Sequence, residues 1–287
     1  MNGCCQEYDA HTQFLMDVHA RCPGLTERSI GAARTGDGLS SYEAFCRFAD
    51  PQPGMTVVDL ACGNGPLCEL LAKSVGPFGQ VVGMDLSEAE LKLAEERLRC
   101  LPNVRLKNES SERLSLPDAA ADLVVCHMAF MLFSPLKPAV AEIGRILKRG
   151  GAFAAVIPTL RTPDELFREC AGVLRAALLA EHHPMDALSG NAVSMNCVPD
   201  LEQIFSEGCW SQENISTCAI DVSVTASPDE LADRIAPAFY HYHLLSLTAR
   251  RGVGLQWAER FARHADGSGR SSFHFPLSAF LVRKRMK

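Results

Sequence analysis

The sequence contains no apolar run that approaches the roughly 20 residues a helix needs to cross a bilayer. Its start, Met1–Asp9, has no basic stretch followed by an apolar one, so we expect no signal peptide. Positive charge is also scarce, because 28 Lys and Arg against 34 Asp and Glu give a net charge of −6. A nucleic-acid partner favours a basic groove. We therefore expect a cytoplasmic protein that binds neither nucleic acids nor membranes.

The sequence also lacks the cysteine and histidine spacings of metal sites. None of its twelve cysteines forms C-x-x-C, and none is paired with histidines at zinc spacing. Most lie in apolar runs, as Cys126, Cys170 and Cys218 do, where a free thiol packs as a small hydrophobic group. We expect reduced thiols and no metal. The adjacent Cys4 and Cys5 leave two readings open, a site for a soft metal or a disordered tail.

The stretch Val57–Leu67 carries the strongest signal in the chain. An apolar, β-branched run leads into Asp59, then Gly63 and Gly65 follow, and Pro66 suits the first position of a helix. The pattern predicts a buried strand, a tight glycine turn and a helix. Glycines let the backbone approach a ligand closely, and a helix N-terminus offers N–H groups to an anionic group.

A dinucleotide-binding turn would read G-x-G-x-x-G, and the third glycine is missing here. Cys68 stands three residues after Gly65, which argues against a nicotinamide-dependent oxidoreductase. The residues alone leave open an ordinary strand-to-helix turn without a ligand.

The motif D-x-A-C-G-x-G at Asp59–Gly65 resembles motif I of the class I S-adenosylmethionine (SAM) dependent methyltransferases. The resemblance runs from Thr56 to Pro158 and is nearest to the small-molecule branch that includes the ubiquinone/menaquinone-biosynthesis C-methyltransferases. It implies SAM as the cofactor. The residues it implies in cofactor binding are Asp59, Ala61, Cys62, Gly63, Asn64, Gly65, Asp85, Leu86, Ser110, Ser111, Cys126 and His127.

Strands and helices alternate from Thr56 to Pro158, and the strands are apolar throughout rather than at every second residue. This predicts a parallel sheet covered on both faces, with ligands beyond the carboxyl ends of its strands. We expect strands at 56–60, 80–85, 103–106, 122–127 and 152–157, and helices at 66–75, from a capping box at Ser87–Glu90 onward, and at 136–147. The pair Gly150-Gly151 is expected to end the last helix.

Three regions follow from this reading. Residues 1–50 form an N-terminal helical cap with helices in Tyr8–Ala20 and Ser41–Phe48, and residues 51–158 form the SAM-binding core. Residues 159–287 form a helical lid around a closing hairpin of the same sheet. The fold class is α/β, a doubly wound, mostly parallel seven-stranded Rossmann-like sheet with a lid insertion. In the last region we expect helices at 163–181 (capped by Thr162), 200–207, 229–248 and 252–264, a loop at 182–196, and strands at 218–225 and 272–283.

Asp85 is expected to bind the ribose of the cofactor. It ends its strand twenty residues after Gly65, and a carboxylate there can accept both ribose hydroxyls. The alternative is a helix N-cap, a role that Ser87 already fills.

The segment in which the family binds adenine departs from the family pattern in this chain. The family often reads D-A-E-x-L-P-F where this chain has N-E-S-S-E-R-L-S-L-P at Asn108–Pro117, so Ser110 replaces the acid that binds the adenine amino group. A neutral serine is a weaker partner than a carboxylate. Ser111, or Glu112 by a small shift, could substitute, and a solvated polar loop is the alternative.

His127 is the candidate catalytic residue. It follows the expected strand 122–127 where the family lines the methyl-transfer point, and a neutral imidazole there could take a proton from the acceptor. The alternative is a histidine that only bonds the backbone or touches the cofactor. The segment lacks the N-P-P-Y type motif of amino-methyltransferases that act on DNA or protein glutamine.

The expected substrate residues are partly polar and partly apolar. Tyr240, His241 and His243 cluster in the lid, and Phe14, Met128 and Met131 could form apolar walls. Core packing is the alternative for each of them.

The sequence thus predicts a SAM-dependent methyltransferase with a small-molecule acceptor. Two alternatives remain: a SAM-binding enzyme of this fold with other chemistry, and an inactive partner subunit. The acceptor, its reacting atom and the oligomeric state, a homodimer included, are left open.

Overall fold

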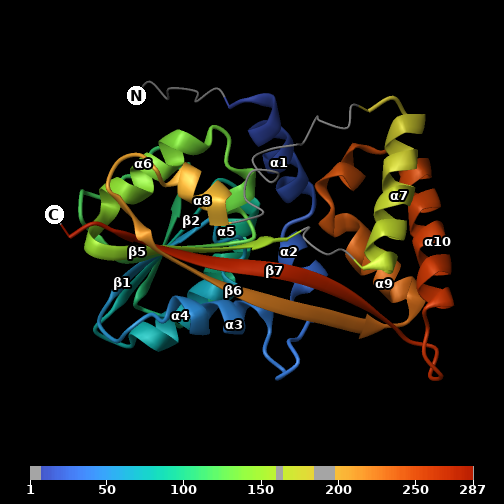
Figure 1. The fold of residues 1–287 in the computed structure, drawn as a ribbon, viewed down its shortest axis with the longest axis horizontal. Coiled ribbons are helices and arrows are strands. Elements are labelled where there is room, and N and C mark those ends of the chain that lie inside the picture. The colour runs from blue at the N-terminus through green and yellow to red at the C-terminus, as the bar shows by residue number, and fades with distance from the viewer. Residues whose placement is uncertain (1–7, 160–163, 184–197, 287) are drawn as a thin grey trace.

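The computed structural model describes residues 8–159, 164–183 and 198–286. Its centre is a seven-stranded sheet of order β3-β2-β1-β4-β5-β7-β6 (Figure 1). The strands are β1 (Thr56–Leu60), β2 (Gln80–Asp85), β3 (Val104–Asn108), β4 (Ala121–His127), β5 (Leu147–Pro158), β6 (Trp210–Ala226) and β7 (Ser271–Lys284). The first five pair in parallel, and β7 pairs antiparallel with β5 and with β6. The predicted fold class is confirmed.

Both faces of the parallel strands are buried, which explains their continuous apolar sequences. Val57 and Val125 pack into the core on one face, whereas Val58 and Val124 pack into the core on the other. The first face is covered by α3 (Ser41–Ala49), α4 (Pro66–Val75) and α5 (Glu88–Leu98), and the second by α6 (Leu136–Ile146) and α8 (Val198–Ile204). Each fully buried aliphatic side chain contributes about 1.5–3 kcal/mol to folding.

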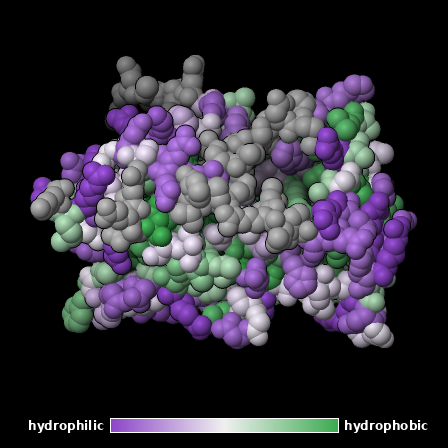
Figure 2. Space-filling model, in the orientation of Figure 1, coloured by the Kyte–Doolittle hydropathy of each residue, from purple (hydrophilic) through white to green (hydrophobic). Residues whose placement is uncertain are grey.

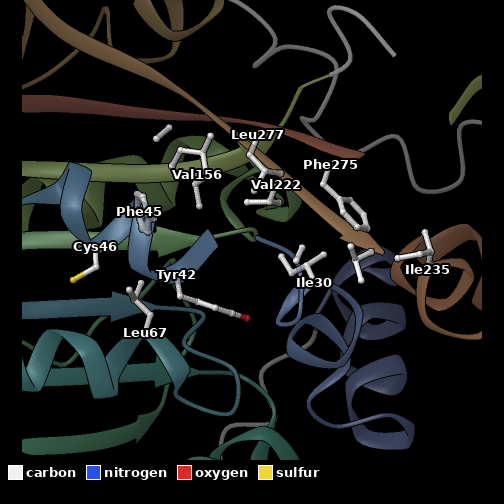
Figure 3. Close-up of a cluster of buried hydrophobic side chains, with 14 of the residues drawn as sticks. Ile30, Tyr42, Phe45, Cys46, Leu67, Val156, Val222, Ile235, Phe275 and Leu277 are labelled. Carbon is white, nitrogen blue, oxygen red and sulfur yellow. The ribbon is translucent and has the colours of Figure 1, made fainter. Parts of the chain in front are cut away.

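The core of the first face continues beyond the parallel strands. Figure 3 shows Phe45 and Val156 at one end of this cluster and Ile30, Ile235 and Phe275 at the other. Helices α7 (Glu165–Ala180), α9 (Pro228–Ile235) and α10 (Leu247–Arg263) gather over the far ends of β6 and β7 (Figure 1). Hydrophilic side chains cover the outer, α10 end of this layer (Figure 2). One apolar core therefore links the sheet to this C-terminal helical layer.

The predicted helix over 229–248 is wrong. Helix α9 ends at Ile235, and two 3₁₀ segments, η3 (Ala236–Ala238) and η4 (Tyr240–Leu244), separate it from α10. Pro237 cannot donate in a helix interior, and Ser246 caps α10 by accepting from Ala249 N. The cluster at Tyr240–His243 is thus on a 3₁₀ segment rather than within a long helix.

Other boundaries also differ from the sequence reading. Gly150 and Gly151 lie inside β5 rather than at a helix end, and β6 begins at Trp210, well before the expected residue 218. Asp164, which accepts from Phe167 N, is the N-cap of α7. The expected cap at Thr162, most of the expected loop 182–196 and the pair Cys4-Cys5 lie outside the described residues.

The N-terminal region contains one more helix than expected. Helices α1 (Ala10–Arg21) and α3 match the predicted pair, and α2 (Leu25–Ile30) lies between them. Ser40 and Glu43 form a complete capping box at the start of α3. In the part of the chain that the structure describes, no helix is long and apolar enough to cross a membrane.

Gly65→Ala tests whether the turn before α4 depends on close packing. Gly65 has a φ of +82°, and an added Cβ would lie 2.8 Å from Leu98 Cδ1 on α5. Gly54 is the matched control, since its φ is +84° and nothing lies within 4 Å of its Cβ position. We expect chemical denaturation to show a loss of unfolding free energy in Gly65→Ala that exceeds the loss in Gly54→Ala by about 1–3 kcal/mol. Equal losses of unfolding free energy in the two variants would show that the cost comes from the positive φ alone and not from the contact with Leu98.

Candidate functional site

A cavity opens at the carboxyl ends of β1, β2 and β4. Asp59, Asp85 and His127 line it from these three strands, while His19 of α1 and Tyr240 of η4 line it from outside the sheet. The space enclosed by these residues, open solvent at its mouth included, is about 1160 Å³. It lies where parallel α/β sheets bind their ligands.

The turn from β1 to α4 has the geometry that motif I predicts. Ala61, Gly63 and Gly65 have φ values of +55°, +53° and +82°, and Pro66 is the first residue of α4. The N-cap Gly65 has no side chain to bond the first-turn N–H groups of the helix. The turn therefore brings backbone N–H groups and a helix N-terminus to the cavity, where they suit an anionic group.

Asp85 is held at the edge of the cavity by two backbone N–H groups. Its Oδ2 accepts from Gly63 N and its Oδ1 accepts from Ser87 N, both at 2.8 Å. Burial raises the pKa of Asp85, and the two N–H groups oppose that rise. A carboxylate can accept about four hydrogen bonds, so capacity remains for ribose hydroxyls.

Asp59 is the second buried carboxyl group beneath the cavity. Burial raises the pKa of Asp59 to about 7, while the Cys68 thiol, which donates to Asp59 Oδ2 at 3.2 Å, lowers it. The charge of Asp85 raises it further. Two acids at the ends of neighbouring strands thus carry a desolvation cost.

The geometry does not favour His127 as a base. His127 is buried, its Nε2 lies 3.2 Å from Ser41 Oγ, and its ring stacks on Tyr42 with centroids 4.1 Å apart. Burial lowers the pKa of His127 to about 3, so the imidazole is neutral and has little affinity for a proton. We interpret His127 as a wall of the cavity fixed by α3.

Polar groups from the loop after β3 also line the cavity. Ser110, Ser111 and Glu112 all contribute to its wall, and Ser110 is buried with its hydroxyl accepting from Glu112 N at 3.3 Å. Burial raises the pKa of Glu112. Acceptors for an amino group are therefore present here, although the acid of the family pattern is replaced by Ser110.

Glu90 connects three elements beside the glycine turn. The predicted capping box is only half present, because Ser87 Oγ accepts from Glu90 N but the Glu90 carboxylate does not return to Ser87. Both Glu90 oxygens accept from Gly24 N at 2.9 Å, and Oε1 lies 2.7 Å from His19 Nδ1. His19 Nε2 lies 2.9 Å from the Tyr240 hydroxyl. The carboxylate thus joins α5 to α1 and η4 over the cavity.

The structure brings most of the sequence-predicted site residues to one cavity. Those that line it are Asp59, Ala61, Cys62, Gly63, Asn64, Asp85, Leu86, Ser110, Ser111, His127, Met128 and Tyr240. Gly65, Phe14 and His241 are not among the lining residues. Cys126 and Met131 are buried in the core of the second sheet face, and His243 bonds Pro237 O through Nε2 at 2.9 Å. We therefore leave these six out of the proposed contacts.

Sequence reasoning missed His19, Glu90 and Tyr42 as lining residues. Glu90 had a local role as a capping residue, and His19 had no motif around it. Only tertiary contacts between α1, α5 and η4 could have revealed His19 and Glu90. Within the described residues, no three His, Cys, Asp or Glu side chains gather in an arrangement that could hold a metal.

Asp59→Asn tests the cost of the buried acid through pH. The folded pKa of about 7 exceeds the ordinary value of 3.8, so stability contributed by the protonated acid is lost as pH rises through this window. We expect the free energy of unfolding of Asp59→Asn, relative to the unaltered protein, to rise by a few kcal/mol between about pH 4 and 7 and then to level off.

Urea unfolding at several pH values measures this difference. The control is Glu69→Gln, which removes an acid on α4 that pairs with Lys73 at the surface. If the difference in unfolding free energy between Asp59→Asn and the unaltered protein does not change with pH, the raised pKa of Asp59 is contradicted.

The comparisons with known proteins agree with this site. A family model described as a methyltransferase domain matches residues 58–155. Demethylmenaquinone methyltransferase of Desulfitobacterium hafniense is 28% identical over 166 residues, which cover 53% of this chain and 65% of that protein. Nocamycin O-methyltransferase of Saccharothrix syringae is 31% identical over 150 residues, 51% of each chain. The chain thus spans less than two thirds of the length of either relative.

Solved structures share the fold over nearly the whole chain. A phosphoethanolamine N-methyltransferase of Haemonchus contortus, solved with phosphomonomethylethanolamine and S-adenosylhomocysteine, has a TM-score of 0.58 at 17% identity, covering 97% of this chain and 61% of that one. The cyclase SpnF has a TM-score of 0.54 at 16% identity, covering 95% and 94%. With the motif I turn and the strand order, these findings show that residues 58–155 match a methyltransferase domain and that the described chain has the fold of these methyltransferases.

Proposed function

We propose that this protein transfers a methyl group from SAM to a small-molecule acceptor. The observation that carries the proposal is the convergence of the motif I turn and Asp85 in a cavity that His19 and Tyr240 also line.

The residues around the cavity suit the parts of SAM. The N–H groups of Ala61–Asn64 would hold the methionyl part, Asp85 the ribose hydroxyls, and Ser110, Ser111 or Glu112 the adenine amino group. When bound, SAM supplies an activated methyl group on a sulfonium. The main contribution of the protein is then to align the acceptor with the methyl carbon and the sulfur and to exclude water.

The acceptor that fits best is small and partly apolar. Leu15, Met16, Met128, Leu132 and Phe133 give the cavity an apolar wall. Two relatives are named for a demethylmenaquinone and for nocamycin, which supports a biosynthetic or secondary metabolite. We propose that α1 and the C-terminal helical layer act as a lid over this acceptor, and that the protein works in the cytoplasm without nucleic acid or membrane partners.

A second candidate is SAM binding with chemistry other than methyl transfer. The likeness in fold to the cyclase SpnF, over nearly all of both chains, keeps this candidate open. An inactive partner subunit would require a damaged cofactor site, and the replacement at Ser110 is the feature that points that way.

Thermal unfolding with SAM, S-adenosylhomocysteine or NAD tests the cofactor. A ligand at a hundredfold over its dissociation constant adds about 2.7 kcal/mol to the stability of the folded state. We expect SAM and S-adenosylhomocysteine to raise the midpoint by several degrees and NAD to leave it unchanged. Asp85→Ala should lose the shift, whereas Asp118→Ala, which alters an exposed acid paired with Arg145, should keep it. Stabilisation by NAD alone would contradict the proposal.

Detection of S-adenosylhomocysteine with candidate acceptors separates methyl transfer from the second candidate. We expect stoichiometric S-adenosylhomocysteine and a methylated product, because displacement at the methyl carbon releases both together. Conversion of an acceptor with SAM left intact would instead support chemistry other than methyl transfer.

A further inference from the structure

The strongest group of polar side chains that the cofactor assignment does not use is Glu90, His19 and Tyr240. The Glu90 side chain is 3% exposed and the His19 side chain is 20% exposed. The rings of His19 and Tyr240 lie 5.9 Å apart at 51°, which suits a hydrogen bond through the hydroxyl rather than stacking. Carboxylate, imidazole and hydroxyl thus form a chain that ends at the cavity.

The donors and acceptors of Glu90, His19 and Tyr240 fix the direction of the hydrogen bonds between them. Both oxygens of Glu90 accept from Gly24 N, so its nearest imidazole nitrogen, His19 Nδ1, must be the donor toward Oε1. In the neutral imidazole, His19 Nε2 then has a free lone pair and accepts from the Tyr240 hydroxyl. The side chain of Thr26 is also hydrogen-bonded to the Tyr240 hydroxyl, so one lone pair of the Tyr240 oxygen remains to accept a proton from a group in the cavity.

Tyr240 lines the cavity from η4, outside the sheet whose edge carries the cofactor motif. It can therefore contact an acceptor that binds beside the cofactor. Burial raises the pKa of Tyr240, which keeps the hydroxyl neutral. The titratable groups whose charges act on this cluster are Glu90 on α5, Asp85 on β2, and His243 on the same 3₁₀ segment.

Building on the proposed methyl transfer, we propose that Tyr240 takes a proton from the acceptor and passes its own to His19, which Glu90 holds in place. The acceptor is then a proton-bearing nucleophile, a hydroxyl or an amine. Its heteroatom forms a bond to the methyl carbon as the carbon–sulfur bond breaks, with the electron pair going to sulfur. The acceptor's proton moves to the Tyr240 oxygen, the Tyr240 proton moves to His19 Nε2, and the imidazolium later releases a proton to water.

Nitrogen-15 NMR of the enzyme saturated with S-adenosylhomocysteine tests the direction of these hydrogen bonds without any methyl acceptor. We expect the neutral His19 ring to carry its proton on Nδ1, and we expect Tyr240→Phe to shift the Nε2 resonance. A proton on Nε2 would overturn the proposal, because this nitrogen could not then take one from Tyr240.

Turnover tests the chemistry with two sets of probes. The first set, substituted catechols, hydroquinones and primary amines, carries a proton on the nucleophile, and the second, tertiary amines and thioethers, does not. We expect turnover of the first set, with kcat reduced about 10²-fold or more in Tyr240→Phe and His19→Gln, and KM for SAM unchanged.

Tyr242→Phe is the matched control, because Tyr242 is half-buried on the same 3₁₀ segment and does not line the cavity. We expect it to keep the full rate. Methyl transfer confined to the second set, or rates within about threefold of normal in Tyr240→Phe, would overturn the inference and leave the proposed function intact. Absence of SAM-dependent thermal stabilisation would instead remove the proposed function itself.

Discussion

The rest of the site depends on the close packing of the turn between β1 and α4. A Cβ at Gly65 would lie 2.8 Å from Leu98 Cδ1, and one at Gly83 on β2 would lie 2.8 Å from Cys68 Sγ. These two glycines let α4 pack tightly against α5 and β2. As a result Gly63 N reaches Asp85 Oδ2 at 2.8 Å, which fixes the acid at the edge of the cavity. Core packing and ligand geometry are therefore set by the same few residues.

Burial shifts the pKa values of three titratable side chains that line the cavity. Asp59 and Asp85 are acids whose pKa values are raised by burial, and His127 is a base whose pKa is lowered by burial. None of the three is paired with an oppositely charged side chain in the contacts described above. A cation bound in the cavity would stabilise both carboxylates, and a sulfonium is a cation. This explains why a site for SAM can keep two acids despite their desolvation cost.

The sequence predicted the sheet and the glycine turn from β1 to α4 because both depend on local pattern. Continuous apolar strands, the Ala61–Gly65 turn and the acid at Asp85 each have a signal within a few residues. The group Glu90, His19 and Tyr240 has no such signal. Glu90 resembled a capping residue, His19 lies 71 positions from Glu90 in the sequence, and Tyr240 lies 221 positions from His19. The helix over 229–248 was wrong because helical residues on both sides concealed the break at Pro237.

Hydrogen exchange of the backbone amides, with and without SAM, tests most directly whether this cavity holds the cofactor. The account predicts slower exchange at Ala61–Asn64, at Asp85–Ser87 and at Ser110–Glu112 when SAM is added, because these segments line one cavity. Protection confined to other parts of the chain, or no change at these three segments under saturating SAM, would contradict it.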